Sequence, residues 1–339
     1  MTRPLLSRRT FGLALSGLLL AGAALAPAQA QTSRVKLLIG FQDTTLPETV
    51  AASKVLEGTP YDVEWVILPG PAAQLSALYS KAIDVGHMGD TSLIIEQGKA
   101  RTPWTAENVP LQIVAGWRAT DAQYPPIITV TRTDARIETL ADLRGKRWAY
   151  NFGGFNYLQY VLSLQKAGLK PADIQPIQLG DQSATSAAFN AGRADVYSGN
   201  FAAVAEAVER GDAKPLLTSD QLDIPALNVF TARGDVVRDR AKSEALADFL
   251  ARVRRHWDWY AANLDTVEKI YTEKVKQSPA RAKISTVYLK ATFRPLDDAV
   301  IAREQAIADV LVASGDLPRK IDVSLEFNRA FNAATTGGN

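Results

Sequence analysis

The stretch that decides the fold of this chain is IDVGHMGDTS, Ile83–Ser92. Its first half predicts a short buried strand, because apolar side chains recur in it, and its two glycines let backbone pass close to another group. Asp90, Thr91 and Ser92 then open an apolar-periodic segment over residues 93–97. The stretch therefore predicts a strand that runs through a tight polar turn into a helix.

The N-terminus of that helix has two interpretations. Its first N–H groups have no partner within the helix and carry a partial positive charge, which makes them a seat for an anion. The alternative is that Asp90 or Thr91 serves only as the N-cap, a position that these residue types favour. Only the remainder of the chain can indicate whether this turn binds an anion or whether its polar residues only cap the helix.

Length and composition indicate a globular protein of two ordinary domains. The chain has 339 residues, with 47% hydrophobic and 22% charged residues. Beyond the N-terminus no apolar run approaches the length of a membrane span. Residues 1–30 contain three of the 38 Lys and Arg residues and none of the 36 acids, so without them the net charge is 35 minus 36, or −1. Nothing in this balance indicates a nucleic acid or an anionic membrane surface as partner.

Residues 1–30 predict a signal peptide. A basic start is followed by an apolar stretch, 12–25, which is short for a bilayer, and by Ala28-Gln29-Ala30, an A-x-A cleavage site. The segment SRRTF at 7–11 resembles a twin-arginine export signal. We expect an exported chain that begins near Gln31 and is soluble in the periplasm, with an uncleaved anchor as the alternative.

Sulfur is scarce in this chain. There is no Cys, and Met88 is the only sulfur-containing residue after the predicted cleavage site. One hypothesis is sulfur economy in a protein made when sulfur is limiting. Compositional drift in an exported protein is the alternative.

Strand and helix patterns alternate along the first part of the chain. Runs of β-forming residues, each followed by a polar turn and a helical pattern, predict strands at 35–41, 61–68, 83–88 and 111–116. Such alternation is typical of a mostly parallel sheet with helices on its faces. A polar crossing with prolines, 121–126, then separates this region from the next.

The middle of the chain shows the same alternation of strand and helix patterns, which predicts a second lobe. It predicts strands at 127–131, 147–151, 174–179, 194–198 and 214–217. Two of its strand-to-helix turns, 152–156 and 199–201, carry Gly beside Asn or an aromatic residue, and parallel α/β sheets bind ligands at such turns. A second crossing, 220–225, leads to a returning strand, 227–232. Four amphipathic helices follow, at 243–263, 265–276, 281–291 and 297–314.

At this point the chain resembles a known family, the periplasmic substrate-binding proteins of ABC importers, in the branch that includes the sulfonate, taurine and nitrate binders. The resemblance is carried by LYSKAIDVGHMGDT (78–91), TLADLRGKRWAY (139–150), QKAGLKPADIQPIQL (165–179) and AAFNAGRADVYSGN (187–200), and it covers essentially the whole chain after the signal. It implies a two-lobed α/β fold of type II with the ligand cleft between the lobes. Lobe one would comprise 31–120 and 225–339, and lobe two 121–224.

The resemblance also implies which residues meet the ligand, since family members bind through turns after strands. Carried over to this sequence and extended by neighbouring polar and aromatic residues, the predicted ligand-binding set is Gln42, Asp90, Thr91, Ser92, Trp117, Gly154, Phe155, Asn156, Asn200 and Phe201. Two turns depart from the family pattern. Residues 152–156 (FGGFN) replace small hydroxyl residues, and 199–201 (GNF) replace a Trp-Asp-Pro-like turn, which favours stacking aromatics and neutral amide hydrogen bonds over added charge.

The chemistry of this set suits a tetrahedral anion held by backbone N–H, hydroxyl and amide donors. Asp90 would repel an anion, so we expect it to act as the helix cap and to face away. Arg118 is the nearest charged candidate, with a solvated hinge arginine as the other interpretation. Aromatic residues at the same turns would hold an aliphatic or aromatic tail, and a cage for a quaternary ammonium is a further alternative.

Enzyme interpretations have little support. The chain has two histidines, His87 and His256, and no Cys. The pattern places His87 in a strand, as a core or ligand-adjacent residue, and His256 on the surface of a helix. No spacing indicates a metal site, and no fingerprint indicates a cofactor. The fold also resembles that of an enzyme that makes the thiamine pyrimidine, but that family uses a cysteine-rich segment.

The sequence therefore predicts a monomeric solute-binding component of an ABC importer that is not an enzyme. The predicted ligand is an organosulfur anion, an alkyl or aryl sulfonate or a sulfate ester, and the predicted partner is a permease in the inner membrane. Taurine, nitrate, betaine or a thiamine-precursor-like pyrimidine are alternative ligands. A sensory pair of lobes that presents its ligand to a receptor is an alternative role.

Overall fold

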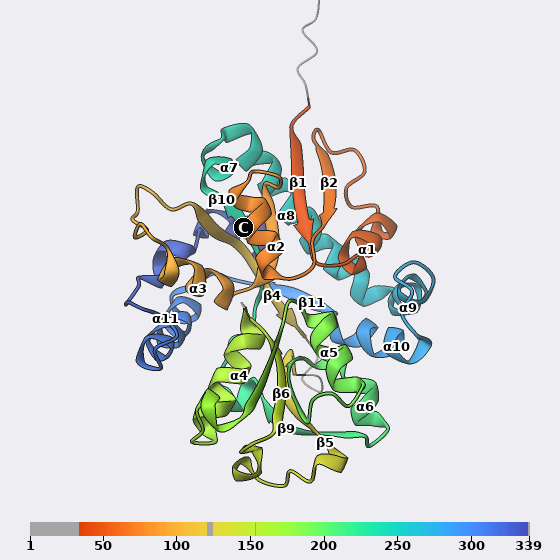
Figure 1. Ribbon diagram of the computed structural model, residues 1–339. Helices are drawn as coiled ribbons and strands as arrows, with labels where there is room; N and C mark the ends of the chain where they lie inside the picture. The colour runs from red at the N-terminus through yellow and green to blue at the C-terminus, as the bar shows by residue number, and fades with distance from the viewer. Residues whose placement is uncertain (1–33, 121–124, 153, 338–339) are drawn as a thin grey trace, which may run out of the picture. The chain divides into compact units, whose positions relative to one another are not determined.

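The computed structural model describes residues 34–120, 125–152 and 154–337. The predicted signal peptide, most of the first predicted crossing and Gly153 lie outside the described residues. The segment Arg34–Asn339 forms one compact unit that contains two β-sheets with helices on their faces (Figure 1). In the described part of the chain, no helix has both the length and the apolar composition needed to cross a membrane.

The first sheet has six strands in the order β11-β4-β10-β3-β1-β2. These are β1 (Lys36–Phe41), β2 (Asp62–Ile67), β3 (Val85–Gly89), β4 (Leu111–Ala119), β10 (Asn228–Arg233) and β11 (Ala291–Arg294). The strands β2 and β3 pair in parallel with β1, whereas β10 lies antiparallel between β3 and β4, and β11 pairs antiparallel with β4.

The second sheet has five strands in the order β7-β6-β8-β5-β9. They are β5 (Ile127–Arg132), β6 (Arg147–Asn151), β7 (Gln175–Leu179), β8 (Val196–Asn200) and β9 (Ala213–Thr218). The strand β6 pairs in parallel with β7 and β8, while β5 lies antiparallel between β8 and β9.

Both sheets are mixed, which refines the prediction of mostly parallel sheets. Most strands of each sheet do share one direction. The exceptions are β5, β10 and β11, and two of them are inserted between strands of the majority direction. The strand β11 was not predicted, because residues 291–294 fall between two helical patterns and are too few to show a period of two.

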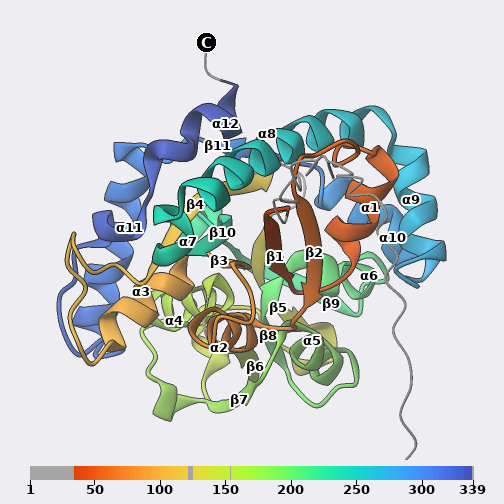
Figure 2. The ribbon, with the colours of Figure 1, turned by 90° about the horizontal axis from the view of Figure 1, so that it is seen from above.

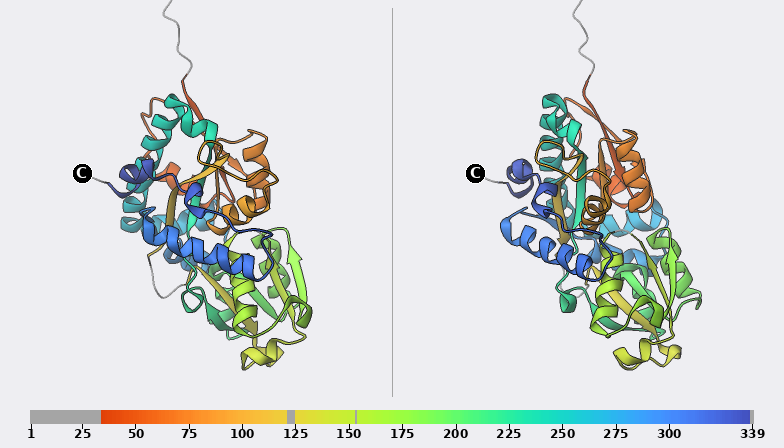
Figure 3. Two further views of the ribbon diagram at one scale, coloured as in Figure 1. Left: turned by 90° about the vertical axis from the view of Figure 1, so that its left-hand side faces the viewer. Right: turned by 60° about the vertical axis from the view of Figure 1, so that its left-hand side comes forward.

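Helices connect the strands and cover both sheets. Their bounds are α1 (Thr45–Ser53), α2 (Pro71–Tyr79), α3 (Thr91–Lys99), α4 (Phe155–Lys166), α5 (Gln182–Asn190), α6 (Ala205–Glu209), α7 (Gly234–Arg238), α8 (Arg240–Ala262), α9 (Leu264–Glu273), α10 (Pro279–Tyr288), α11 (Asp298–Ala313) and α12 (Asn332–Thr336). In Figure 2 the long helix α8 runs along the first sheet, and in Figure 3 α11 is seen as a long C-terminal helix, which contacts α3.

The core follows from the alternation of side chains along the strands. In β1, Leu37 and Ile39 join an apolar cluster that contains Phe249, Leu250 and other residues of α8. Leu38 between them packs against a different cluster, which includes residues of α2, α3 and α11. Successive side chains of a strand point to opposite faces, so a strand that is apolar on both faces is covered by helices on both sides.

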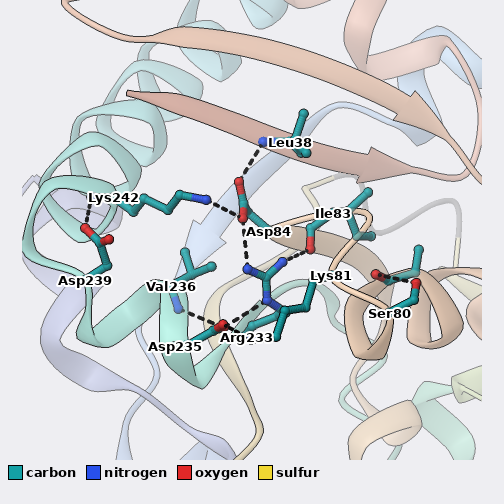
Figure 4. Close-up of polar contacts among 11 residues, drawn as sticks. Leu38, Ser80, Lys81, Ile83, Asp84, Arg233, Asp235, Val236, Asp239 and Lys242 are labelled. Atoms are coloured by element: carbon teal, nitrogen blue, oxygen red, sulfur yellow. Dashed lines mark hydrogen bonds and ion pairs between the residues drawn. The ribbon is translucent and has the colours of Figure 1, made fainter. Parts of the chain in front are cut away.

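A buried ionic cluster lies at the start of β3, within the stretch that decides the fold (Figure 4). The carboxylate of Asp84 accepts a hydrogen bond from Leu38 N at 3.0 Å and pairs with Lys242 Nζ at 2.7 Å and with the Arg233 guanidinium at 3.2 Å. Only 2% of the Asp84 side chain is exposed. One carboxylate thus joins β1, β10 and α8 at the amino end of β3.

Candidate functional site

The candidate site is a pocket where the carboxyl ends of strands from both sheets meet. It has a volume of about 220 Å³. From the first sheet it is lined by residues that end β1, β3 and β4 and by Asn228, which begins the antiparallel β10; from the second sheet it is lined by residues at or after the ends of β6, β7 and β8. Ligands bind at this edge of α/β sheets, so the position itself supports a binding role.

Six of the ten predicted site residues line this pocket. In the first sheet they are Gln42, which follows β1, and Trp117, which lies near the end of β4; in the second sheet they are Gly154, Phe155, Asn156 and Asn200, which end or follow strands. The structure thus brings together turns that are more than 100 residues apart in the sequence. Gln42 is also held in place, because its Nε2 donates to the carbonyl of His87 at 3.2 Å.

The other four predicted site residues lie outside the lining. Asp90, Thr91 and Ser92 are at most 1% exposed. Phe201 packs in an apolar cluster with Ile128 and other residues of the second sheet, while its neighbour Asn200 reaches the pocket. The N-terminus of α3, the predicted anion seat, is therefore covered.

Two features cover that helix terminus. The Asp90 carboxylate accepts hydrogen bonds from Thr91 N at 2.7 Å and from Leu227 N at 2.6 Å, so it is the N-cap and also ties the turn to the segment before β10. The Phe155 ring lies against Gly89, where an added Cβ would be 2.4 Å from Phe155 Cδ1. Only glycine permits this close approach between the two turns.

Three buried carboxyl groups gather behind the turn. Asp90, Glu304 of α11 and Glu326 are each at most 1% exposed. Burial, together with the nearby Asp90 carboxyl, raises the pKa of Glu304 well above its ordinary value, and burial likewise raises the pKa of Glu326. Among the described residues, no group of three or more His, Cys, Asp or Glu side chains has the arrangement of a metal site.

His87 lies in the pocket wall between two aromatic rings. Its ring stacks on Phe41 with centroids 4.0 Å apart and on Trp117 at 5.3 Å. Its Nε2 is 3.2 Å from Asn228 Oδ1. Burial lowers the pKa of His87 to about 4, so the ring is neutral at physiological pH. The structure thus places His87 in the lining of the pocket.

His256 corrects a prediction, because it is fully buried rather than on the surface. It lies between α8 and α1, with Nε2 3.3 Å from Thr49 Oγ1 and Nδ1 3.1 Å from Ser53 Oγ. The amphipathic pattern of α8 did not reveal this burial, because a helix packed against other helices along much of its length has a wider buried face than a single stripe.

Stability should fall between pH 7 and pH 5 because of these histidines. Burial lowers the pKa of His256 to about 3, whereas an unfolded histidine titrates near 6.5. Below pH 6.5 the unfolded state binds a proton that the folded state excludes, so acid favours unfolding. The free energy of unfolding, measured with denaturant at pH 7 and at pH 5, should fall by about 2 kcal/mol less in the His256→Asn variant than in the unmodified chain. Equal losses in the two proteins would contradict the assignment.

Several lining residues were not predicted. They include Asn151, Asp181 and Gln182 at or after the ends of strands of the second sheet, Trp257 of α8, Arg281 of α10, and Gln277 of the loop between α9 and α10. The rule that ligands bind at the carboxyl ends of strands selected Asn200, at the end of β8. The same rule applies equally to Gln182, which follows β7. The C-terminal residues carry no local signal, because their helices are brought to the pocket only by tertiary packing.

Arg281 is the one cationic residue among the described residues that line the pocket. Its charge acts on the buried Tyr197 hydroxyl: burial raises the pKa of Tyr197, and the Arg281 charge opposes this. Arg118, the arginine considered from sequence, is instead bound to Pro225 O at 3.2 Å and to the Asp220 carboxylate, outside the lining. Arg118 thus contacts the second predicted crossing, 220–225, and does not line the pocket.

Comparisons with known proteins place the chain in a family. The family model described as NMT1/THI5 like matches residues 62–266, which is 205 of 339 residues. A curated relative from Escherichia coli (strain K12), named as an aliphatic sulfonates-binding protein, is 26% identical over 330 residues, or 93% of this chain and 95% of the relative.

Solved structures agree on the fold. The alkanesulfonate-binding protein SsuA from Xanthomonas axonopodis pv. citri, bound to MOPS, matches with a TM-score of 0.74 at 23% identity, covering 87% of this chain and 99% of that one. The periplasmic aliphatic sulphonate binding protein SsuA from Escherichia coli matches with a TM-score of 0.70 at 21% identity, covering 87% and 92%. The predicted α/β binding-protein fold and the resemblance stated from sequence are confirmed, and the chain belongs to the NMT1/THI5-like family.

Proposed function

We propose that this protein is the periplasmic solute-binding component of an ABC importer and that its ligand is an organosulfur anion, a sulfonate or a sulfate ester. The observation that carries the proposal is the pocket at the facing strand ends of two sheets. The homologous Escherichia coli protein named as a sulfonates-binding protein supports the ligand class. We further propose the division into lobes at 31–120 with 225–339 and at 121–224, the cleavable signal over 1–30, an inner-membrane permease as partner, and a monomeric state.

The lining suits a singly charged anion with a polar tail. Its polar and charged side chains include seven neutral carboxamides, one guanidinium and two carboxylates, and these are Gln42, Asn151, Asn156, Gln182, Asn200, Asn228, Gln277, Arg281, Asp43 and Asp181. We infer that Arg281 is the charge partner of the anion, since a hydrogen bond to a charged group contributes more than one between neutral groups. The rings of Phe41, Trp117 and Trp257 supply apolar surface for the remainder of the ligand.

We also infer that the pocket binds without chemistry. The chain has no Cys to serve as nucleophile. The polar partner that the structure gives the His87 side chain is the Asn228 amide, at 3.2 Å, rather than a hydroxyl that it would activate or a carboxylate that would orient it. A nucleophile–base pair requires such contacts.

Calorimetry on the chain from Gln31 onward tests the ligand class. The panel comprises propane-1-sulfonate, benzenesulfonate, an alkyl sulfate, nitrate and glycine betaine. We expect binding of the sulfonates or the sulfate ester and none of nitrate or betaine. Binding of betaine or nitrate alone would overturn the proposal, and unchanged thermal unfolding with every member of the panel would do the same.

A further inference from the structure

We propose that the ligand carries a hydrogen-bond donor, a hydroxyl or an ammonium group, in addition to its anionic head, and that Asn156 Oδ1 accepts from it. This inference rests on the proposed function, because it specifies the kind of sulfonate. It follows from the direction of one hydrogen-bond network at the edge of the second sheet, where the ends of β6, β7 and β8 meet.

A backbone group sets the direction of the network. The N–H of Asn200 donates to Gln182 Oε1 at 3.1 Å. A backbone N–H can only donate, so the oxygen of the Gln182 carboxamide must face it. Its Nε2 then donates to the Tyr197 hydroxyl, and that hydroxyl donates its own proton to Asn200 O at 2.9 Å. Gln182 therefore cannot reverse its carboxamide without breaking these contacts.

The same oxygen fixes the next carboxamide. Asn156 Nδ2 donates to Gln182 Oε1 at 2.6 Å and to Asn151 Oδ1 at 3.0 Å, which engages both of its hydrogens. Asn156 Oδ1 remains as the free end. It is buried and has no partner among the described residues. Asn156 is 8% exposed and lines the pocket. The network thus leaves a buried, unpaired acceptor on a side chain that lines the pocket.

A second unpaired acceptor is on His87, which lines the same pocket from β3 of the first sheet. The neutral His87 ring has Nε2 against Asn228 Oδ1, which leaves Nδ1 with a lone pair and no partner among the described residues. The carboxylates of Asp43 and Asp181 also line the pocket, but they already accept hydrogen bonds, from Thr45 N at 2.8 Å and from Ala184 N at 2.8 Å. A buried acceptor without a donor is costly, and a site built to bind a donor rejects the analogue that lacks it. A plain alkyl tail leaves Asn156 Oδ1 and His87 Nδ1 unpaired.

Matched ligands test the inference. Propane-1-sulfonate, 2-hydroxyethanesulfonate and 2-aminoethanesulfonate have the same length and differ only in the terminal group. Calorimetry should show that at least one of the donor-bearing ligands binds at least tenfold more tightly than propane-1-sulfonate, which corresponds to about 1.4 kcal/mol. Equal or tighter binding of propane-1-sulfonate would overturn this inference and leave the proposed function standing. If no sulfonate binds, the proposed function itself fails.

Two variants of Gln182, the positioning residue, test the mechanism. Gln182→Glu keeps an acceptor for Asn200 N–H and Asn156 Nδ2, so the tenfold preference should persist even if overall affinity falls. Gln182→Met has a similar length but no acceptor, so Asn156 can turn and the preference should shrink toward onefold. Thermal unfolding checks that both variants fold; if Gln182→Met does not, Asn156→Leu provides the comparison. If Gln182→Met kept the full tenfold preference for donor-bearing ligands, the hydrogen-bond network of Gln182 would not be the source of that preference.

Discussion

Replacing Arg281 by glutamate should weaken sulfonate binding about a hundredfold. The substitution removes the charge-assisted hydrogen bond proposed for the anion, which contributes roughly 1.5–3 kcal/mol, and it adds like-charge repulsion. Arg281→Gln removes only the attraction and should weaken binding about tenfold. Because Arg281 is exposed to solvent, the effect should decrease as salt is raised. Calorimetry at two ionic strengths measures both quantities.

Lys283 offers a matched control for this prediction. It lies two residues further along α10, is exposed and does not line the pocket. Lys283→Glu makes the same change in net charge, so it should leave sulfonate affinity within about twofold, as expected for a screened surface charge. Equal losses in the two variants would mean that net charge, and not a contact in the pocket, controls binding.

Asp84→Ala should destabilise the protein by about 3–5 kcal/mol. The substitution leaves Lys242 without its partner and the Leu38 N–H without its acceptor, and it leaves Arg233 with the Asp235 carboxylate as its ion-pair partner, at 2.9 Å. Breaking a buried ion pair by removing one partner has a cost of this size, since an uncompensated charge remains in the interior. Urea unfolding monitored by tryptophan fluorescence would measure the loss. A smaller fraction of the Asp84→Ala variant should therefore be folded, even though Asp84 does not line the pocket.

A surface pair on the same sheet provides the comparison. Lys36 and Glu64 form an ion pair between β1 and β2, and their side chains are 55% and 53% exposed. Glu64→Ala should therefore cost less than about 1 kcal/mol. If Asp84→Ala costs no more than Glu64→Ala, the cluster in Figure 4 does not stabilise the sheet as described.

The site predicted from sequence and the site in the structure differ for an identifiable reason. The general rule that ligands bind at turns after strands selected Gln42, Asn156 and Asn200, which line the pocket, because that rule depends on local patterns. The choice of one particular helix terminus, at Asp90 and Thr91, placed the anion at a position that the structure buries. The Asp90 carboxylate accepts a hydrogen bond from Leu227 N, which is 137 residues further along the chain, and no local sequence pattern indicates this contact.

The sequence alone determined the class of fold, the positions of most strands and helices, and several of the turns that line the pocket. These depend on side-chain periodicity and on glycine or polar residues at element ends, all of which are local properties. Tertiary structure alone decided the insertion of β10 between β3 and β4, the burial of His256, the entry of Arg281 into the pocket and the direction of the Gln182 network. These depend on contacts between segments that lie far apart along the chain, and packing, not periodicity, selects them.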